Sequence, residues 1–189
     1  GDRYGFDYDL NVQSYNAWVQ NVITLRKVDV FISGSIGQNT SWRKGNFRNG
    51  RFPEFSLGES TKNTFLEYGV KGGITYKIDG RNYILGNIGY FSQAPLVKNI
   101  YTSPRTRNAI APLLSNEKIL SLEGGYQYVA PKLKVKLIGY LTNFEDRTTR
   151  TSFFNDVDGT FVNFNMTGIN QQNAGVEIGT EINLSSKWR

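Results

Sequence analysis

The chain has 189 residues, no cysteine, no histidine and a formal net charge of +6. The absence of these two residue types excludes disulfide scaffolds, thiolate or imidazole metal sites and catalytic triads that need histidine. No stretch approaches the ~20 consecutive apolar residues of a membrane-spanning helix, and the basic residues form no stripe or arm typical of nucleic-acid binding. We therefore predict no nucleic-acid partner, no metal and no cofactor.

The composition favours β-structure with many hairpins. Tyrosine, phenylalanine and glycine are abundant, at 11, 12 and 20 residues, and the first two are enriched in strands. The hydrophobic content of 39% and the mean hydropathy of -0.42 are low for a domain with a thick apolar core. A membrane β-barrel is compatible with these values, because one face of each strand meets lipid and the other meets water.

Seven segments show the alternation of apolar and polar residues that predicts strands. They lie at residues 8–25, 28–42, 64–78, 83–92, 118–129, 133–144 and 161–184. In the first segment the alternation slips near Ser14, which predicts a β-bulge. Most segments exceed the ~5–6 residues of a typical globular strand and satisfy the ~9–11 residues that a tilted strand needs to cross a bilayer.

The connections between these segments alternate between short and long. Short turns are expected at residues 26–28, 79–82, 130–132 and 185–188, and long polar loops at 43–60, 93–117 and 145–160. In an up-and-down meander this order places all short turns at one end and all long loops at the other, as in outer-membrane barrels with periplasmic turns and extracellular loops. We therefore predict an all-β fold, an antiparallel up-and-down meander of about seven long strands in a transmembrane β-barrel.

The hairpin from Phe65 to Tyr90 shows the two faces most clearly. Asp79-Gly80 predicts a tight type I′ turn, which needs positive φ at both central positions. One face carries apolar or aromatic side chains expected to meet lipid: Leu66, Tyr68, Val70, Ile74, Tyr76, Ile78, Ile84, Ile88 and Tyr90. The other face carries charged side chains expected to meet the lumen: Glu67, Lys71 and Lys77.

Aromatic residues near strand ends predict girdles at the two membrane interfaces. The candidates are Tyr15, Trp18, Trp42, Tyr68, Tyr76, Tyr83, Tyr90, Tyr126, Tyr128 and Trp188.

The long loops are the expected place for ligand contact, because loops on a rigid scaffold commonly carry function. One loop holds Arg43, Lys44, Arg48 and Arg51, and the next holds Arg105 and Arg107, with several aromatic residues nearby. These residue types suit an acidic or sugar-like ligand; the alternative is pairing with lipopolysaccharide phosphates or with acidic residues of other loops. The candidate substrate-binding residues are Trp42, Arg48, Arg51, Tyr101, Arg105 and Arg107.

Several stretches resemble the barrel region of TonB-dependent outer-membrane receptors, most closely the large receptors of Bacteroidetes-type bacteria. They are "NGRFPEFSLGES", "YGVKGGITYKIDGRNYILGNIGYFSQAP", "SPRTRNAIAPLLSNEKILSLEGGYQY" and "NQQNAGVEIGTEINL". The resemblance implies a segment of a 22-stranded barrel that is plugged by an N-terminal domain and imports a scarce nutrient, such as a glycan, peptide or siderophore, with energy delivered through TonB. The plug domain and the remaining strands are absent from this sequence.

The resemblance also implies the partners: the lipid bilayer and lipopolysaccharide, the chain's own plug domain and remaining barrel strands, TonB, and a surface lipoprotein. The expected location is the outer membrane of a Gram-negative cell. We predict that the chain is not an enzyme. Two alternatives stay open, a small stand-alone outer-membrane barrel with an adhesive or structural role and a secreted glycan-binding β-sandwich.

Overall fold

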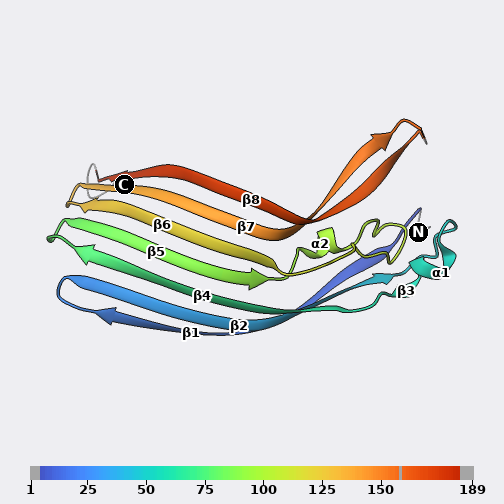
Figure 1. The fold of residues 1–189 in the computed structure, drawn as a ribbon, viewed down its shortest axis with the longest axis horizontal. Coiled ribbons are helices and arrows are strands. Elements are labelled where there is room, and N and C mark those ends of the chain that lie inside the picture. Colours follow the sequence, from blue (N-terminus) through green and yellow to red (C-terminus); the bar gives the residue numbers. More distant parts are fainter. Residues whose placement is uncertain (1–4, 158, 184–189) are drawn as a thin grey trace.

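The computed structural model describes residues 5–157 and 159–183, which form one antiparallel sheet. Successive long strands are neighbours in the order β1-β2-β4-β5-β6-β7-β8, and β3 pairs with β2 (Figure 1). The predicted all-β fold, an up-and-down meander of seven long strands, is confirmed. The elements are β1 (Tyr8–Thr24), β2 (Val28–Gly45), α1 (Pro53–Ser56), β3 (Gly58–Glu59), β4 (Asn63–Lys77), β5 (Asn82–Gln93), α2 (Val97–Ile100), β6 (Glu117–Val129), β7 (Leu133–Asn155) and β8 (Thr160–Ile182).

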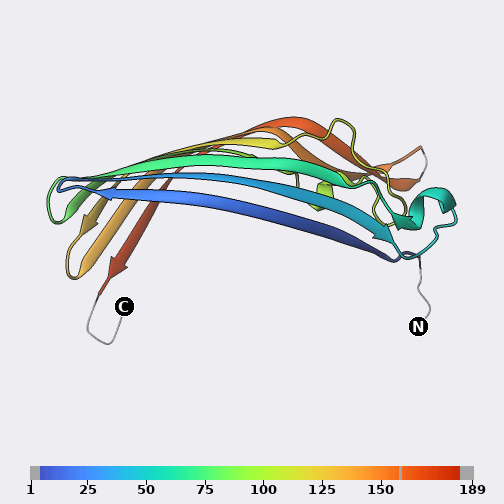
Figure 2. The same ribbon diagram turned by 90° about the horizontal axis from the view of Figure 1, so that it is seen from below.

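The sheet is curved and has two unlike ends. Figure 2 shows a concave and a convex side, with α2 beneath the arch on the concave side. The short connections between β1 and β2, β4 and β5, and β6 and β7 lie at one end of the sheet, here called the turn end (Figure 1). The connections that carry α1 and α2 lie at the opposite end, called the loop end.

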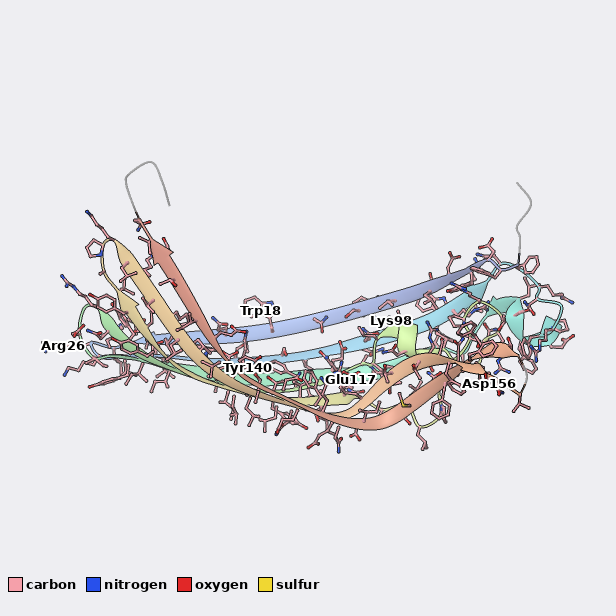
Figure 3. The ribbon with its side chains drawn as sticks, turned by 90° about the horizontal axis from the view of Figure 1, so that it is seen from above. Trp18, Arg26, Lys98, Glu117, Tyr140 and Asp156 are labelled. Atoms are coloured by element: carbon pink, nitrogen blue, oxygen red, sulfur yellow. The ribbon has the colours of Figure 1, made fainter. Side chains whose placement is uncertain are left out.

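The strand register separates the side chains into two faces, because directly paired residues of antiparallel strands point the same way. Trp18 points to the concave side (Figure 3) and pairs with Ser35, which pairs in turn with Gly69. Glu67, Lys71 and Lys77 therefore lie on the concave face. The predicted division of the β4–β5 hairpin into one charged face and one apolar face is confirmed.

The convex face carries a continuous apolar band. Ile74 pairs with Val30 on one side and with Gly86 on the other, and the band extends across all seven long strands. Its members are Val19, Ile23, Val30, Ile32, Ile36, Val70, Ile74, Ile84, Ile88, Leu122, Leu137, Val176 and Ile178, whose exposure ranges from 37% to 73%. No second layer of the described chain covers this band.

The concave face is mainly polar and held by cross-strand pairs. Lys77 Nζ lies 2.6 Å from Asp29 Oδ1, and Lys134 Nζ lies 3.3 Å from Glu181 Oε2. Exposed cross-strand ion pairs contribute little free energy each, so they fix register more than stability. Among the described residues, the buried apolar side chains are Ile100, Tyr101 and Ala111, all in the β5–β6 loop rather than in the sheet.

Two pairs of tyrosines border the convex band, one pair toward each end of the strands. Tyr76 and Tyr126 both pair with Ile84 toward the turn end, whereas Tyr68 and Tyr90 lie toward the loop end with ring centroids 6.4 Å apart. The girdle prediction was wrong for Trp18 and Tyr83, which the register places on the concave face. It overlooked that residues near strand ends still alternate between faces. Trp188 lies outside the described residues.

The β4–β5 turn differs from the predicted type I′ geometry. Neither Asp79 nor Gly80 has a positive φ. Instead, Asp79 Oδ1 accepts hydrogen bonds from the backbone N–H groups of Arg81 at 2.7 Å and Asn82 at 2.9 Å. These bonds, that from Arg81 first, lower the pKa of Asp79. A carboxylate that bonds the backbone ahead of it offers an alternative turn.

The predicted irregularity near Ser14 is absent, since the β1–β2 register runs without a shift from Tyr8 to Thr24. The register shifts occur instead in β7, between Phe144 and Thr149. There Asp146 has a φ of 58°, and Gly168 on β8 has a φ of 71°. Bulges bend and twist a strand, and beyond this point the β7–β8 hairpin turns away from the sheet (Figure 1).

The predicted loop at 145–160 was therefore mostly wrong, because β7 continues to Asn155 and β8 begins at Thr160. Two other strands are also longer than expected: β6 begins at Glu117 instead of residue 118, and β2 ends at Gly45 instead of residue 42. Leu184 and the predicted turn at 185–188 lie outside the described residues. None of the helices that the structure describes is long and apolar enough to cross a membrane.

Adjacent glycines on β6 offer a test of the packing. A Cβ at Gly125 would overlap the backbone carbonyl of Leu137 and the side chain of Ile138, whereas a Cβ at Gly124 would meet only the Leu85 carbonyl oxygen at 4.0 Å. In the full-length protein, Gly125→Ala should lower the free energy of unfolding by about 1–3 kcal/mol, the usual cost of overpacking. The free energy of unfolding is measured by urea titration, and Gly124→Ala should leave it unchanged. Equal effects of the two variants would contradict this packing.

Candidate functional site

Arg43 joins β2 to both long loops at the loop end. Its side chain is 1% exposed and lies closer to the loop end of the sheet than Tyr68 and Tyr90 do. The guanidinium donates hydrogen bonds from Nε to the Pro104 carbonyl at 2.6 Å and from Nη1 to the Ser56 carbonyl at 2.9 Å. A third bond runs from Nη1 to Asn108 Oδ1 at 2.6 Å. One rigid, planar donor group thus fixes three separate points of the two loops.

The surroundings of Arg43 fit a buried cation without an acidic partner. Its guanidinium lies 5.3 Å from the centroid of the Tyr8 ring, a cation–π arrangement. Burial lowers the pKa of Arg43, while Tyr8 and Tyr101 raise it, and an arginine stays protonated in such a setting. Gly45 leaves the space that the Ser56 carbonyl occupies, because a Cβ there would overlap that oxygen.

Tyr101 anchors the β5–β6 loop from inside. Its side chain is fully buried, and its hydroxyl lies 2.8 Å from Ser60 Oγ, which also accepts the Arg43 backbone N–H at 3.0 Å. Tyr101 pairs with Ile110 in an isolated antiparallel bridge. The loop therefore has its own small core and its own backbone pairing.

The same loop is attached to the far side of the sheet. Asn99 Nδ2 donates to the Thr148 carbonyl at 2.8 Å, and Asn165 Nδ2 donates to the Asn99 carbonyl at 2.6 Å. Arg150 Nη1 donates to the Tyr101 carbonyl at 3.1 Å. With Arg43 on β2 and these contacts on β7 and β8, the loop spans the concave side, where Figures 2 and 3 show α2.

A cavity of about 990 Å³ opens between this loop, the β2–β3 loop and the outer part of the β7–β8 hairpin. Its lining holds four arginines, three aromatic rings and no acidic residue among the described residues. The arginines are Arg51, Arg105, Arg107 and Arg150, and the rings are Tyr8, Phe52 and Phe161. Its size lies at the upper end of the ~300–1,000 Å³ range of small-molecule sites.

Three arginines of this basic cavity lie near aromatic rings, and the fourth, Arg150, donates a hydrogen bond to a backbone carbonyl. Arg105 lies 4.9 Å from the Phe6 centroid, and Arg107 lies 4.7 Å from that of Phe52. None of the four arginines forms an ion pair within the described part of the chain. Arg107 Nε is buried without a hydrogen-bond partner. Four positive charges therefore gather in this cavity without an ion-pair partner among the described residues.

The structure brings three of the six predicted site residues together, since Arg51, Arg105 and Arg107 line one cavity. Trp42 lies on the opposite face from Arg43, with Lys62 Nζ 4.7 Å from its ring, and the exposed Arg48 is not part of the lining. Tyr101 is buried and positions the loop, so its side chain does not reach the cavity.

Sequence reasoning overlooked Arg150, Tyr8 and Phe161. Arg150 was assigned to a loop, and the register shifts in β7 prevent its face from being counted along the strand. The pair Phe154–Phe161, with ring centroids 5.4 Å apart in an edge-to-face arrangement, lies across the same hairpin. The alternation of side chains has to be counted anew from residue 149, after the register shifts, and counted in this way it could have identified the outer part of β7 as a strand.

No protein-family model matches the chain, and no curated protein matches its sequence. Among solved structures, the chain is similar to the copper transporter OprC, with a TM-score of 0.67 and 14% identity. The match covers 94% of this chain and 28% of that transporter, so the chain spans little more than a quarter of its length. This similarity shows the fold of the chain, a curved antiparallel meander consistent with a segment of a β-barrel.

The role of Arg43 can be tested by its removal. In the full-length protein, Arg43→Ala should leave three oxygen acceptors without their donor, and hydrogen bonds to charged groups contribute ~1.5–3 kcal/mol each. We expect residues 94–116 to exchange amide hydrogens at least about tenfold faster, measured by hydrogen–deuterium exchange with mass spectrometry. Arg48→Ala, which removes an exposed arginine from the β2–β3 loop just after β2, is the control. Equal exchange in both variants would contradict the anchoring role.

Proposed function

We propose that the chain is part of the transmembrane β-barrel of an outer-membrane, TonB-dependent receptor that imports a scarce nutrient. The observation that carries this proposal is the exposed apolar band on the convex face of a single curved sheet. The fold similarity to a solved transporter supports the same class of protein. The sequence resemblance to Bacteroidetes-type receptors supports the finer assignment.

The dimensions of the band match a membrane. The stretch of β4 from Tyr68 to Tyr76 runs between the two tyrosine pairs and holds nine residues, within the ~9–11 residues that a tilted strand needs to cross a bilayer. The apolar belt of outer-membrane barrels is ~25 Å tall and lies between aromatic girdles. In this proposal the convex face meets lipid, the turn end is periplasmic and the loop end is extracellular.

The two edges of the sheet indicate a larger barrel. β1 and β8 pair with one neighbour each and not with each other in the described structure. Long unpaired edges are unstable in lipid, because their backbone groups have no partner there. We propose that further strands complete a barrel of about 22 strands, which a plug domain fills from the concave side and TonB engages from the periplasm.

The alternatives fit the structure less well. A glycan-binding β-sandwich needs two stacked sheets, whereas the described strands form one. A stand-alone barrel needs pairing between its first and last strands, and β1 and β8 lie apart in the order of the sheet. We propose a transport role without enzymatic activity, with lipopolysaccharide around the barrel and a surface lipoprotein above the loops as further partners.

The lipid contact predicts an asymmetry between adjacent positions of β4. In the full-length protein folded into phospholipid vesicles, Ile74→Lys should lower the free energy of unfolding by about 2–4 kcal/mol, the cost of a lysine near the middle of the bilayer. Thr75→Lys, on the concave face, should change it by less than about 1 kcal/mol. The measurement is a urea or guanidinium titration followed by tryptophan fluorescence, and equal costs would exclude lipid on the convex face.

The receptor assignment also predicts what the gene encodes around this chain. The reading frame should continue upstream into a plug domain with a TonB-binding segment and should supply the remaining strands. Sequencing the flanking DNA tests this directly. A start codon just before Gly1 and a stop codon just after Arg189 would contradict the proposal.

A further inference from the structure

The basic cavity at the loop end has features of a ligand site rather than of ordinary surface. Like charges that share a concave site repel one another, and the described residues of the lining include no acid that would offset the repulsion. Arg107 keeps a buried Nε–H without an acceptor among the described residues, and an unpaired buried donor costs free energy. These costs are expected at functional sites, where local stability is commonly sacrificed.

The position of the cavity separates it from the lipid and its headgroups. Its walls are the β5–β6 loop on the concave side and the inward face of the β7–β8 hairpin, where Arg150 pairs with Asn165 and Ser152 with Asn163. Lipopolysaccharide would surround the convex side. The nearby acidic residues Glu54 and Glu59 line a neighbouring cavity that Arg107 also borders, and neither forms an ion pair with an arginine of the basic cavity in the described structure. In the described structure, therefore, no acidic side chain is paired with these arginines, and lipopolysaccharide would lie on the other face of the sheet.

The chemistry of the lining defines what would fill it. Guanidinium groups bind carboxylate, sulfate and phosphate through paired, charge-assisted hydrogen bonds. Ser103, Thr106 and Asn163 add neutral hydrogen-bonding groups, and Phe161, which is 74% exposed, offers a ring face at the rim. A volume of about 990 Å³ holds a molecule of several rings rather than a single small ion.

We propose that this cavity binds a ring-containing ligand with at least two anionic groups, carboxylate, sulfate or phosphate, as the nutrient that the receptor captures. The inference rests on the proposed function for its biological role, but the binding site stands on the geometry alone. Arg51, Arg105 and Arg107 supply the anion contacts. Arg150 joins them while it holds the Tyr101 carbonyl.

The test is a binding titration on the full-length protein in detergent at low salt. Three anionic probes are used: tetragalacturonate, a sulfated galactose tetrasaccharide and inositol hexakisphosphate. Their uncharged counterparts are tetragalactose and inositol. At least one anionic probe should bind, its affinity should fall as salt rises because the charges are partly exposed, and its uncharged counterpart should bind at least about a hundredfold more weakly.

Charge-removing variants locate the site. Loss of one charged hydrogen-bonding group costs about tenfold or more in affinity, so Arg105→Gln with Arg107→Gln should weaken the bound probe about a hundredfold. The lysine pair at the same positions should recover part of the affinity. Arg51→Gln, at an exposed position, is a second variant that should leave the fold intact and weaken the bound probe about tenfold. Arg26→Gln, at the turn end (Figure 3), is the matched control and should bind like the parent protein.

Three results would overturn the assignment: none of the anionic probes binds, an uncharged counterpart binds equally well, or both glutamine variants keep full affinity. The proposed function is judged separately, by uptake of the bound probe into cells with and without TonB. Specific binding without TonB-dependent uptake would contradict the receptor role and leave the site. A flanking plug domain and TonB-binding segment without any anionic binding would do the reverse.

Discussion

An apolar face that no part of the described chain covers is the constraint on which this structure depends. In a water-soluble protein that face would need a second layer, since a sheet is stable only when its hydrophobic side is buried. Here the apolar side chains of seven strands remain exposed on the convex side, and the buried apolar residues of the described chain belong to one loop. In the proposed membrane barrel, the bilayer would be the solvent that makes this arrangement favourable, and the length of the strands would follow from its thickness.

The same constraint moves the specific packing to the loop end. A single sheet has no interior in which to position a functional group, so the β5–β6 loop builds a small core of its own around Tyr101. Arg43 fastens that loop to β2, and polar contacts from β7 and β8 fasten its other side. The β5–β6 loop is thus attached at both sides of the concave face, and a binding site requires such support for its side chains.

Periodicity made the faces of the strands predictable, because alternation depends only on the backbone. It could not identify the β4–β5 turn, where the Asp79 carboxylate competes with the expected type I′ geometry. Nor could it separate Arg43 from the other arginines of the same loop. Arg43 is buried because carbonyl groups distant in sequence converge on it, and such convergence is a property of the folded loops.

The two kinds of arginine at the loop end differ in what satisfies them. Arg43 spends its donors on carbonyl and amide oxygens of the protein, so its charge stabilises structure and is unavailable to a ligand. Arg105 and Arg107 of the basic cavity instead lie near the rings of Phe6 and Phe52 and form no ion pair with the described chain, so their charge remains available to an anion. Arg43 therefore fixes the loops that hold the arginines of the basic cavity in place. A change at Arg43 would disperse this cationic cluster without removing any of its charges.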